Sequence, residues 1–286
     1  MHRIGVLAAA CALLACESAA GPTAIPCAPS PFRAEPPLVI AHAGGEGLGP
    51  ENTVAAMERS LAAGADALDV DLRMTVDGVI VARHDRDVAT TTDGSGNVDS
   101  LTWAQIQQLD AAARWDGAPV DDAVRVPSLE QVLQRFPDER ISLELKQVEP
   151  SMAEPLCDLL RRTNSSDRVY LSSNEDAAVY AAGEACPEVL ITTTYRDLDD
   201  MRAAEAAGTD WCAASPIGQP PYREGRFDRE RVEQSHDRGM ALYTWVVDDP
   251  DVLRELADAG VDGVYTRRPD IARTVFDHFA ASPEGG

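Results

Sequence analysis

The 286-residue sequence is poor in positive charge and almost devoid of lysine. It has 25 Lys and Arg residues against 48 Asp and Glu residues, a net charge of −23, and Lys146 is its single lysine. This balance argues against nucleic acid as a partner and against electrostatic adsorption to anionic membranes, because both need clustered positive charge. The position of the one lysine is therefore of interest.

The apolar run at the amino end, residues 4–15, is too short to span a membrane as a mature helix. It follows a basic start and ends at Cys16, which resembles a bacterial lipoprotein signal. We expect residues 1–15 to be a signal peptide, Cys16 to be lipidated, and residues 16–37 to be a tether rich in Ala, Pro and Ser. The protein is then exported and lipid-anchored in the cell envelope, on the periplasmic or cell-surface side, with that anchor as its only membrane contact. Cleavage elsewhere and free secretion is the alternative.

The sequence contains no Cys-x-x-Cys spacing typical of metal sites. Of its six cysteines, Cys11 leaves with the signal and Cys16 carries the lipid. The remaining four are Cys27, Cys157, Cys186 and Cys212. An even number in an exported chain indicates two disulfides, for which three pairings are possible.

The stretch from Leu38 to Thr53 predicts one β/α unit with chemistry at the end of its strand. The apolar run of residues 38–41 ends at His42, and a glycine-rich loop then leads to a helix capped by Asn52 or Thr53. Each piece also has a purely structural interpretation, in which the histidine is only hydrogen-bonded and the Glu-Asn-Thr sequence only starts the helix. Polar residues at other strand ends favour the functional one.

The next predicted strand, residues 67–72, alternates so that Asp69 and Asp71 share one face. Two carboxylates that project together repel each other unless a cation lies between them. An Asp-Gly turn follows and predicts a hairpin, whose return strand brings His84 back toward the level of the two aspartates.

Residues 141–146 form a third alternating strand, which places Glu144 and Lys146 on one face. Regular alternation of helices and strands follows, and we predict strands that start near residues 38, 67, 141, 169, 189, 211, 241 and 262. Eight such units indicate an α/β fold, a (β/α)8 TIM barrel spanning residues 38–286. Residues 86–127, with a short helix at 102–112, are predicted to be a small insertion after the second-strand hairpin, usable as a lid.

The polar residues at these strand ends suggest phosphoryl chemistry. Asp69, Asp71 and Glu144 offer hard oxygen ligands that suit one Ca²⁺ or Mg²⁺ ion. His42 and His84 can act as general acid and base. Lys146, a compact point charge, suits a phosphate. The alternatives are carboxylates paired with arginines, and a lysine paired with Glu144 or another acid.

These motifs closely resemble the glycerophosphodiester phosphodiesterase family. The matching residues are His42-Ala43-Gly44 through Pro50-Glu51-Asn52-Thr53, Asp69-Val70-Asp71, Thr75-Val76-Asp77-Gly78, His84-Asp85, Pro127-Ser128-Leu129-Glu130, Glu144-Leu145-Lys146, Trp245 and Gly260-Val261-Asp262-Gly263. The resemblance implies a barrel enzyme that uses a divalent cation to cleave glycerophosphodiesters to an alcohol and glycerol 3-phosphate. It also implies that His42 and His84 form the acid/base pair and that Asp69, Asp71 and Glu144 bind the metal.

Three positions depart from the family pattern. Ala43 stands where the family usually has an arginine that helps to hold the phosphate, and Asp69 stands where glutamate is common. Arg267 stands where the family often has aspartate, and we hypothesise that its guanidinium replaces the missing one. Its alternative is an exposed surface charge.

Two further residues have open roles. Glu51 belongs to the family motif and either contacts the metal or orients its neighbours. Trp245 either forms a platform for glycerol or the alcohol headgroup or packs in the barrel.

Two other functions fit the same residues less well. A phospholipase D-like enzyme acting on lysolipid or sphingolipid headgroups uses a similar site, but the polar segment 86–127 does not favour contact with lipid. A non-catalytic lipoprotein that binds phosphodiesters is supported only by Ala43. We therefore predict a metal-dependent phosphodiesterase acting on a small glycerophosphodiester.

Overall fold

The computed structural model describes residues 27–120 and 123–281. The predicted signal peptide, Cys16 and the first part of the tether lie outside these residues. Within the described chain, no helix combines the length and apolar composition needed to cross a membrane.

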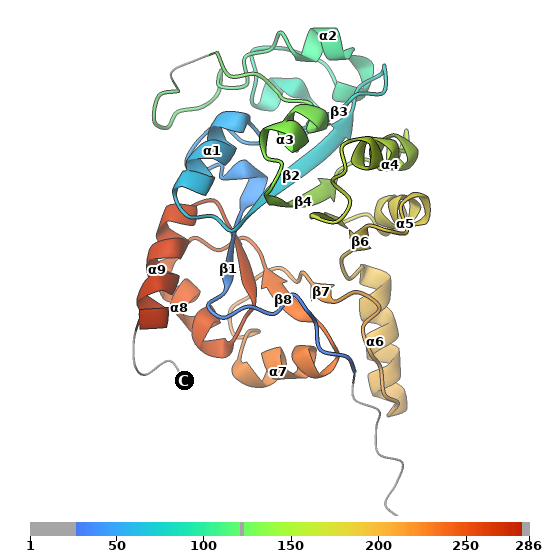
Figure 1. The fold of residues 1–286 in the computed structure, drawn as a ribbon, viewed down its shortest axis with the longest axis vertical. Helices are drawn as coiled ribbons and strands as arrows, with labels where there is room; N and C mark the ends of the chain where they lie inside the picture. Colours follow the sequence, from blue (N-terminus) through green and yellow to red (C-terminus); the bar gives the residue numbers. More distant parts are fainter. Residues whose placement is uncertain (1–26, 121–122, 282–286) are drawn as a thin grey trace, which may run out of the picture.

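The centre of the molecule is a curled sheet with the strand order β6-β5-β4-β2-β1-β9-β8-β7, all parallel, with β3 added antiparallel to β2 (Figure 1). The strands are β1 Leu38–Ala41, β2 Ala67–Met74, β3 Ile80–Ala82, β4 Arg140–Leu145, β5 Val169–Ser172, β6 Leu190–Ile191, β7 Ile217–Gly218, β8 Ala241–Thr244 and β9 Gly263–Thr266. The repeated β/α order and this topology confirm the prediction of a curled parallel α/β sheet of the barrel type.

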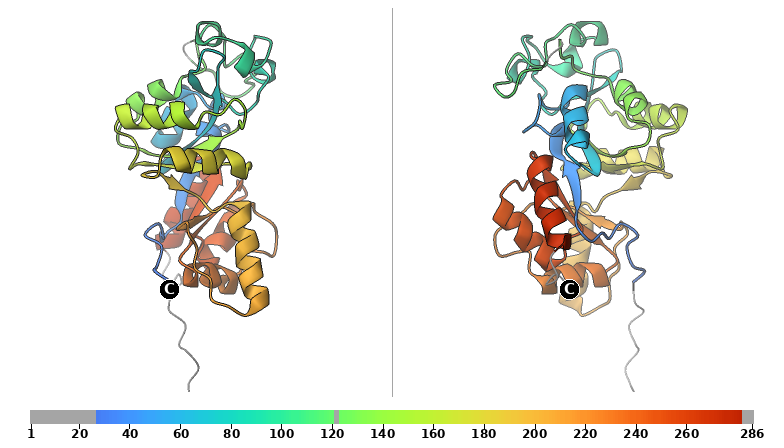
Figure 2. Two further views of the ribbon diagram at one scale, coloured as in Figure 1. Left: turned by 90° about the vertical axis from the view of Figure 1, so that its right-hand side faces the viewer. Right: turned by 60° about the vertical axis from the view of Figure 1, so that its left-hand side comes forward.

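Helices connect the strands and cover the outside of the sheet, as Figures 1 and 2 show. They are α1 Val54–Ala62, α2 Trp103–Ile106, α3 Leu129–Arg135, α4 Ala153–Arg162, α5 Asp176–Ala185, α6 Tyr195–Ala207, α7 Arg229–Asp237, α8 Pro250–Ala259 and α9 Pro269–Ala281, with short 3₁₀ helices η1 His42–Gly44, η2 Val88–Thr90 and η3 Val98–Ser100. Several begin at side-chain caps that the sequence supplies. Thr53 accepts a hydrogen bond from the amide of Ala56, and Asp249 caps α8 just before a proline at the first helical position.

Among the described residues, the two edge strands β6 and β7 do not pair as a ladder, and Thr193 links the chain after β6 to β7. The amide and the hydroxyl of Thr193, just after β6, both donate to the carbonyl oxygen of Ile217, at 2.9 Å each. Each of these strands is two residues long, so the sheet is weakest where it closes.

The predicted strand at residues 211–214, the sixth of the eight, is wrong. The strand is instead Ile217–Gly218, which pairs with the start of β8. Prolines flank this short buried pair on both sides, so the sequence there resembles a loop. The expected helix at 102–112 is also shorter, because only Trp103–Ile106 is α-helical and turns follow it.

The buried core divides into two main clusters that follow the two sides of the sheet. One joins β2, β4 and β5 to helices α1, α3, α4 and α5, and the other joins β8 and β9 to α7, α8 and α9. Inside the curled sheet, a third cluster contains tyrosines, and the hydroxyl groups of Tyr170 and Tyr265 lie 3.1 Å apart. The sheet therefore encloses packed side chains below its carboxyl-end rim.

Residues 83–120 and 123–127, between β3 and α3, carry η2, η3 and α2 at one end of the molecule (Figure 1). They have their own small apolar cluster, which includes Val88, Val98 and Ile106. The segment is thus a packed subregion beside the sheet.

Two disulfides link the four predicted cysteines: Cys27 bonds to Cys212 and Cys157 to Cys186. The first one fixes the end of the predicted tether. Ser30 donates a 2.7 Å hydrogen bond to the carbonyl oxygen of Pro216, and the carbonyl of Phe32 accepts one from Tyr243. The stretch from residue 27 to 37 therefore packs on the barrel, so a stable domain must include it.

Candidate active site

A cavity of about 760 Å³ opens at the carboxyl ends of the strands. Its lining includes residues that end or follow β1, β4, β5, β6, β7 and β8, and five of the predicted site residues: His42, Asp69, His84, Glu144 and Lys146. Trp245 lines it as well. The volume is in the range of small-molecule sites, and this end of a barrel sheet is where enzyme sites lie.

The loop that holds His42 turns sharply because three successive residues adopt left-handed backbone conformations. Ala43, Gly44 and Gly45 have φ values of 47°, 76° and 94°. At Gly45 a side chain is also excluded by space, since a Cβ atom there would lie 1.8 Å from the Ser60 hydroxyl. The turn aims the amide of Ala43 at Asp69, at a nitrogen–oxygen distance of 3.4 Å.

His42 is held by a carboxylate that sequence reasoning missed. Its Nδ1 lies 3.1 Å from Oε1 of Glu46, four residues further along the loop. Burial lowers the pKa of His42, but the Glu46 hydrogen bond and the charges of Asp69 and Asp71 outweigh it and raise the pKa to about 9. Glu46 therefore fixes the orientation of the imidazole and favours its charged form.

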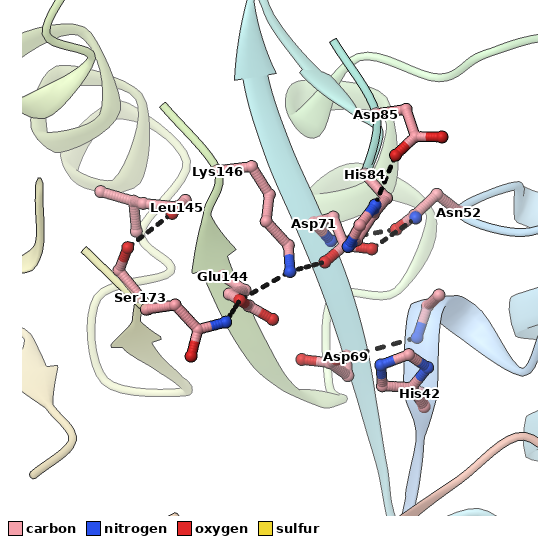
Figure 3. A network of polar contacts seen from close by, with 12 residues as sticks. His42, Asn52, Asp69, Asp71, His84, Asp85, Glu144, Leu145, Lys146 and Ser173 are labelled. Carbon is pink, nitrogen blue, oxygen red and sulfur yellow. Dashed lines mark hydrogen bonds and ion pairs between the residues drawn. The ribbon is translucent and has the colours of Figure 1, made fainter. Parts of the chain in front are cut away.

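The acidic residues converge because β2 and β4 run parallel in register. Asp71 is the direct neighbour of Glu144 across the two strands, and Asp69 lies two positions earlier on the same face of β2 (Figure 3). Both aspartates are buried. Burial raises the pKa of Asp69; the charge of His42 opposes this, while the nearby carboxylates of Asp71 and Glu144 add to it.

Lys146, one residue beyond β4, places its ammonium between two of these acids. Its Nζ is 2.6 Å from Oε1 of Glu144 and 3.2 Å from Oδ1 of Asp71. Burial works against the charged ammonium, but the carboxylates outweigh it and raise the pKa of Lys146. Lys146 therefore forms the ion pairs with Glu144 and Asp71 that were the alternative to a phosphate-binding role.

Asn52 makes a two-point contact with Asp71 that the sequence did not reveal. Its Nδ2 donates to Oδ2 of Asp71 at 2.7 Å, and its Oδ1 accepts from the backbone amide of Asp71 at 3.0 Å. Asn52 is buried and has a left-handed φ of 56°. The helix cap is Thr53, so Asn52 is free to orient the carboxylate.

His84 reaches the cavity from the loop after β3, on the side of Asp71 (Figure 3). Its Nδ1 lies 2.8 Å from Oδ1 of Asp85, and its backbone carbonyl accepts a 2.7 Å hydrogen bond from Nε of Arg73. The hairpin therefore brings the second histidine into the same cavity as the first, as the Asp-Gly turn predicts.

The carboxylates of the site fit a divalent cation. The buried Oδ1 of Asp71 makes no hydrogen bond to any described residue, although the Lys146 ammonium lies nearby. An orphaned carboxylate oxygen beside two further carboxylates is a donor set that suits Mg²⁺ or Ca²⁺. A cation at these oxygens competes with Lys146 for them.

The three acids are not a closed ligand cluster. Among the described residues, the only group of three His, Cys, Asp or Glu side chains with all ligand atoms within 4.8 Å of one another is Cys157, Cys186 and Glu188. Those two cysteines form a disulfide, so that group is no metal site.

Three predicted site residues of the described chain lie outside the cavity lining: the fully buried Asp71, Arg267 and Glu51. Arg267 is half-exposed, and its Nε lies 2.6 Å from Oδ2 of Asp248. Burial, together with the charges of Glu46 and Asp71, raises the pKa of Glu51, which stands behind the histidine loop. No described residue of 86–127 lines the cavity, so the structure gives no support to a lid there.

Trp245 occupies the rim after β8. Its Nε1 donates to the carbonyl oxygen of Gln219 at 2.9 Å, and its ring lines the cavity. It therefore contacts both the barrel rim and the space open to a ligand.

This arrangement of side chains defines a class of enzyme. Carboxylates suited to a divalent cation, two histidines that can move protons and a lysine that can meet an anion are typical of barrel enzymes that hydrolyse phosphate esters. The family model of the glycerophosphoryl diester phosphodiesterases matches residues 42–271. The chain belongs to this family, and its enzyme class is that of the phosphoric diester hydrolases.

Known relatives agree with this assignment. A glycerophosphodiester phosphodiesterase of Caldanaerobacter subterraneus is 29% identical over 240 residues, which cover 82% of this chain and 95% of that protein. The crystal structure of an Agrobacterium tumefaciens glycerophosphodiester phosphodiesterase is 25% identical with a TM-score of 0.68, covering 83% of this chain and 99% of that one.

A third relative adds a ligand. An Oleispira antarctica phosphodiesterase solved in complex with its product sn-glycerol-3-phosphate has a TM-score of 0.70 and 22% identity, over 84% of this chain and 97% of that one. At this identity the likeness concerns the fold.

Proposed function

We propose that the protein hydrolyses glycerophosphodiesters to an alcohol and glycerol 3-phosphate with the help of one divalent cation. The observation that carries the proposal is that two histidines, Asp69, Glu144 and the single lysine line one cavity, with the buried Asp71 directly beside Glu144, in a chain of this family. The product named for the Oleispira relative is the one proposed here.

His42 and His84 are the proposed acid and base. Both line the cavity, His42 beside Asp69 and His84 near Asp71 (Figure 3), so that one can deliver a proton to the leaving oxygen and the other can remove one from the attacking water. Each ring is oriented by a neighbouring carboxylate at Nδ1, which leaves Nε2 for the substrate.

Asp69, Asp71 and Glu144 are the proposed ligands of Ca²⁺ or Mg²⁺. When bound, such an ion supplies a Lewis acid that polarises a phosphoryl oxygen. Lys146 supplies the positive charge for the phosphate. This role gains weight from Ala43, which is buried and brings no guanidinium to the histidine loop.

The export prediction is retained as part of the proposal. The two disulfides support it, because such bonds persist mainly in oxidising compartments. Lipidation at Cys16 and the anchored location are tested by a Cys16→Ser substitution, which should move the protein from the membrane fraction to the soluble fraction. An unchanged distribution would rule out the anchor.

The test of the function uses the chain from Cys27 onward, which keeps both disulfides. We expect it to release glycerol 3-phosphate from glycerophosphocholine, to stop after chelation, and to recover when Ca²⁺ or Mg²⁺ is added back. His42→Ala should lower kcat by about 10²–10⁴-fold. Turnover that survives complete chelation would contradict the role of the cation, and a fully active His42→Ala protein would contradict the role of the histidine.

A further inference from the structure

The active-site cavity has a second wall of opposite charge. From residue 192 onward its lining contains arginines and no Asp or Glu, although acidic residues outnumber basic ones by 48 to 25 in the whole chain. The arginines on this wall are Arg202, Arg223, Arg226, Arg231 and Arg238. The cavity therefore runs from an acidic end, where the cation is proposed, to a basic end between β7, α6 and α7.

Two of these arginines have no charged partner among the described residues. The other three are paired with acids: Arg202 with Asp199, Arg231 with Asp228 and Arg238 with Glu205. The guanidinium groups of Arg223 and Arg226 make no hydrogen bond or ion pair with any residue that the structure describes. An unpaired guanidinium at a cavity wall is a donor available to a ligand.

The loop that carries both arginines, residues 219–228 between β7 and α7, is fixed in place (Figure 1). The amide of Tyr222 donates to the carbonyl oxygen of Trp245 at 2.7 Å, and the Trp245 ring donates back to Gln219. Within the loop, the rings of Tyr222 and Phe227 stack with their centroids 5.8 Å apart. The two guanidiniums thus project from a braced backbone, which lowers the entropic cost of binding.

We propose that Arg223 and Arg226 bind a phosphate group carried by the leaving alcohol, so that the preferred substrates are glycerophosphodiesters with a second phosphate. The inference builds on the proposed function and adds the class of alcohol. Guanidinium groups match phosphate oxygens in pairs. Neutral or cationic alcohols, such as glycerol or choline, have no anionic group that these guanidiniums could bind.

The test compares two substrates that differ in one phosphate. Glycerophosphoglycerol has a neutral leaving alcohol, and its terminal phosphate monoester has the anionic one. At one fixed ionic strength, because the net charge of −23 repels anions, the unmodified protein should show kcat/KM about 10-fold to 100-fold higher for the phosphorylated diester. The rate of loss of each diester is measured by mass spectrometry, with the same method for both substrates.

A double variant and a matched control locate the effect. Arg223→Gln with Arg226→Gln should bring the two kcat/KM values within about twofold of each other and leave that of the neutral diester nearly unchanged. Arg114→Gln with Arg140→Gln removes the same two charges from exposed positions outside the cavity, and should keep the preference. If both double variants lost the preference for the phosphorylated diester equally, the preference would depend only on net charge, and the subsite would be overturned.

A binding measurement separates this inference from the proposed function. Calorimetry with the intact phosphorylated diester and a His42→Ala protein needs no turnover, and adding the Arg223 and Arg226 substitutions should weaken binding about tenfold or more. Absence of turnover with both diesters would overturn the proposed function alone. Unchanged binding in the variant would overturn the subsite. The subsite would also be overturned if a lysophospholipid were cleaved faster than the phosphorylated diester, because its acyl chain would then use the apolar side chains of Leu198, Met201 and Phe227 on the same wall.

Discussion

The two sides of the sheet are built differently. On one side, β2 and β4 share six paired positions and carry the carboxylates and the lysine. On the other side, β6 and β7 are two residues long, and α6 has no buried residue, whereas α4 has five. The side that holds the reacting groups is thus rigid and acidic, and the side proposed to meet the alcohol is loosely paired and basic. Chemistry needs fixed geometry, while the alcohol is the part of a diester that varies.

The largest effect is expected when a charge is removed from the rigid side. Asp71→Asn keeps the size of the side chain and removes the charge of a buried carboxylate. We expect turnover to fall by about 10³-fold, beyond the 10–100-fold typical of groups that only support a metal ligand. Glycerol 3-phosphate release and thermal unfolding, measured together, check this. A folded Asp71→Asn protein with normal turnover would remove Asp71 from the site.

Core packing offers a second contrast between the two sides. Leu143 on β4 is fully buried, whereas Leu198 on α6 is partly exposed beside the cavity. Leu143→Ala should lower the free energy of unfolding by about 2–5 kcal/mol, and Leu198→Ala by about 0.5 kcal/mol or less. Denaturant titration of both variants measures the difference, and equal losses would show that α6 is packed as tightly as the core.

Asn52 tests whether the rigid side depends on groups that support the ligands. Asn52→Gly keeps a residue that tolerates a left-handed backbone but removes both contacts to Asp71, and activity or cation affinity should fall by about 10–100-fold. Asn164, with a φ of 51°, has the same backbone class on an exposed turn. Asn164→Gly is therefore the control and should leave turnover unchanged; a similar loss in both would point to backbone effects.

The sequence predicted the rigid side better than the other one. Alternation along β2 and β4 placed Asp69, Asp71, Glu144 and Lys146 together, because a period of two fixes the face of a strand. The predicted strand at residues 211–214 was misplaced, since the actual strand Ile217–Gly218 has only two residues and lies between two prolines, where no periodicity can show. Weak local signals and weak pairing coincide at the same place in the sheet.

Within the site, the residues that support others escaped sequence reasoning. Asn52 was assigned to a helix start, and only its left-handed backbone in the structure turns its amide toward Asp71. Arg223 and Arg226 lie in a loop whose sequence has no helix or strand periodicity. The positive charge of the cavity wall could not be predicted, because the wall is formed by segments that are distant in the sequence. The replacement role suggested for Arg267 relied on its place at a strand end, but in the structure it pairs with Asp248 outside the cavity lining.

The smallest effect is expected at Glu46, which touches the site only through His42. Glu46→Ala leaves the ring in place but frees its rotation, so kcat should fall about tenfold while KM changes little, because orientation and not binding is lost. Glu46→Gln can still accept a hydrogen bond from Nδ1 and should restore most of the rate. Steady-state kinetics of both variants check this, with Glu58→Ala as the control, since Glu58 pairs with Arg135 away from the cavity. If Glu46→Ala instead raised KM and left kcat intact, Glu46 would contribute to substrate binding. The histidine loop would then belong to the binding side of the cavity as well as to the reacting side.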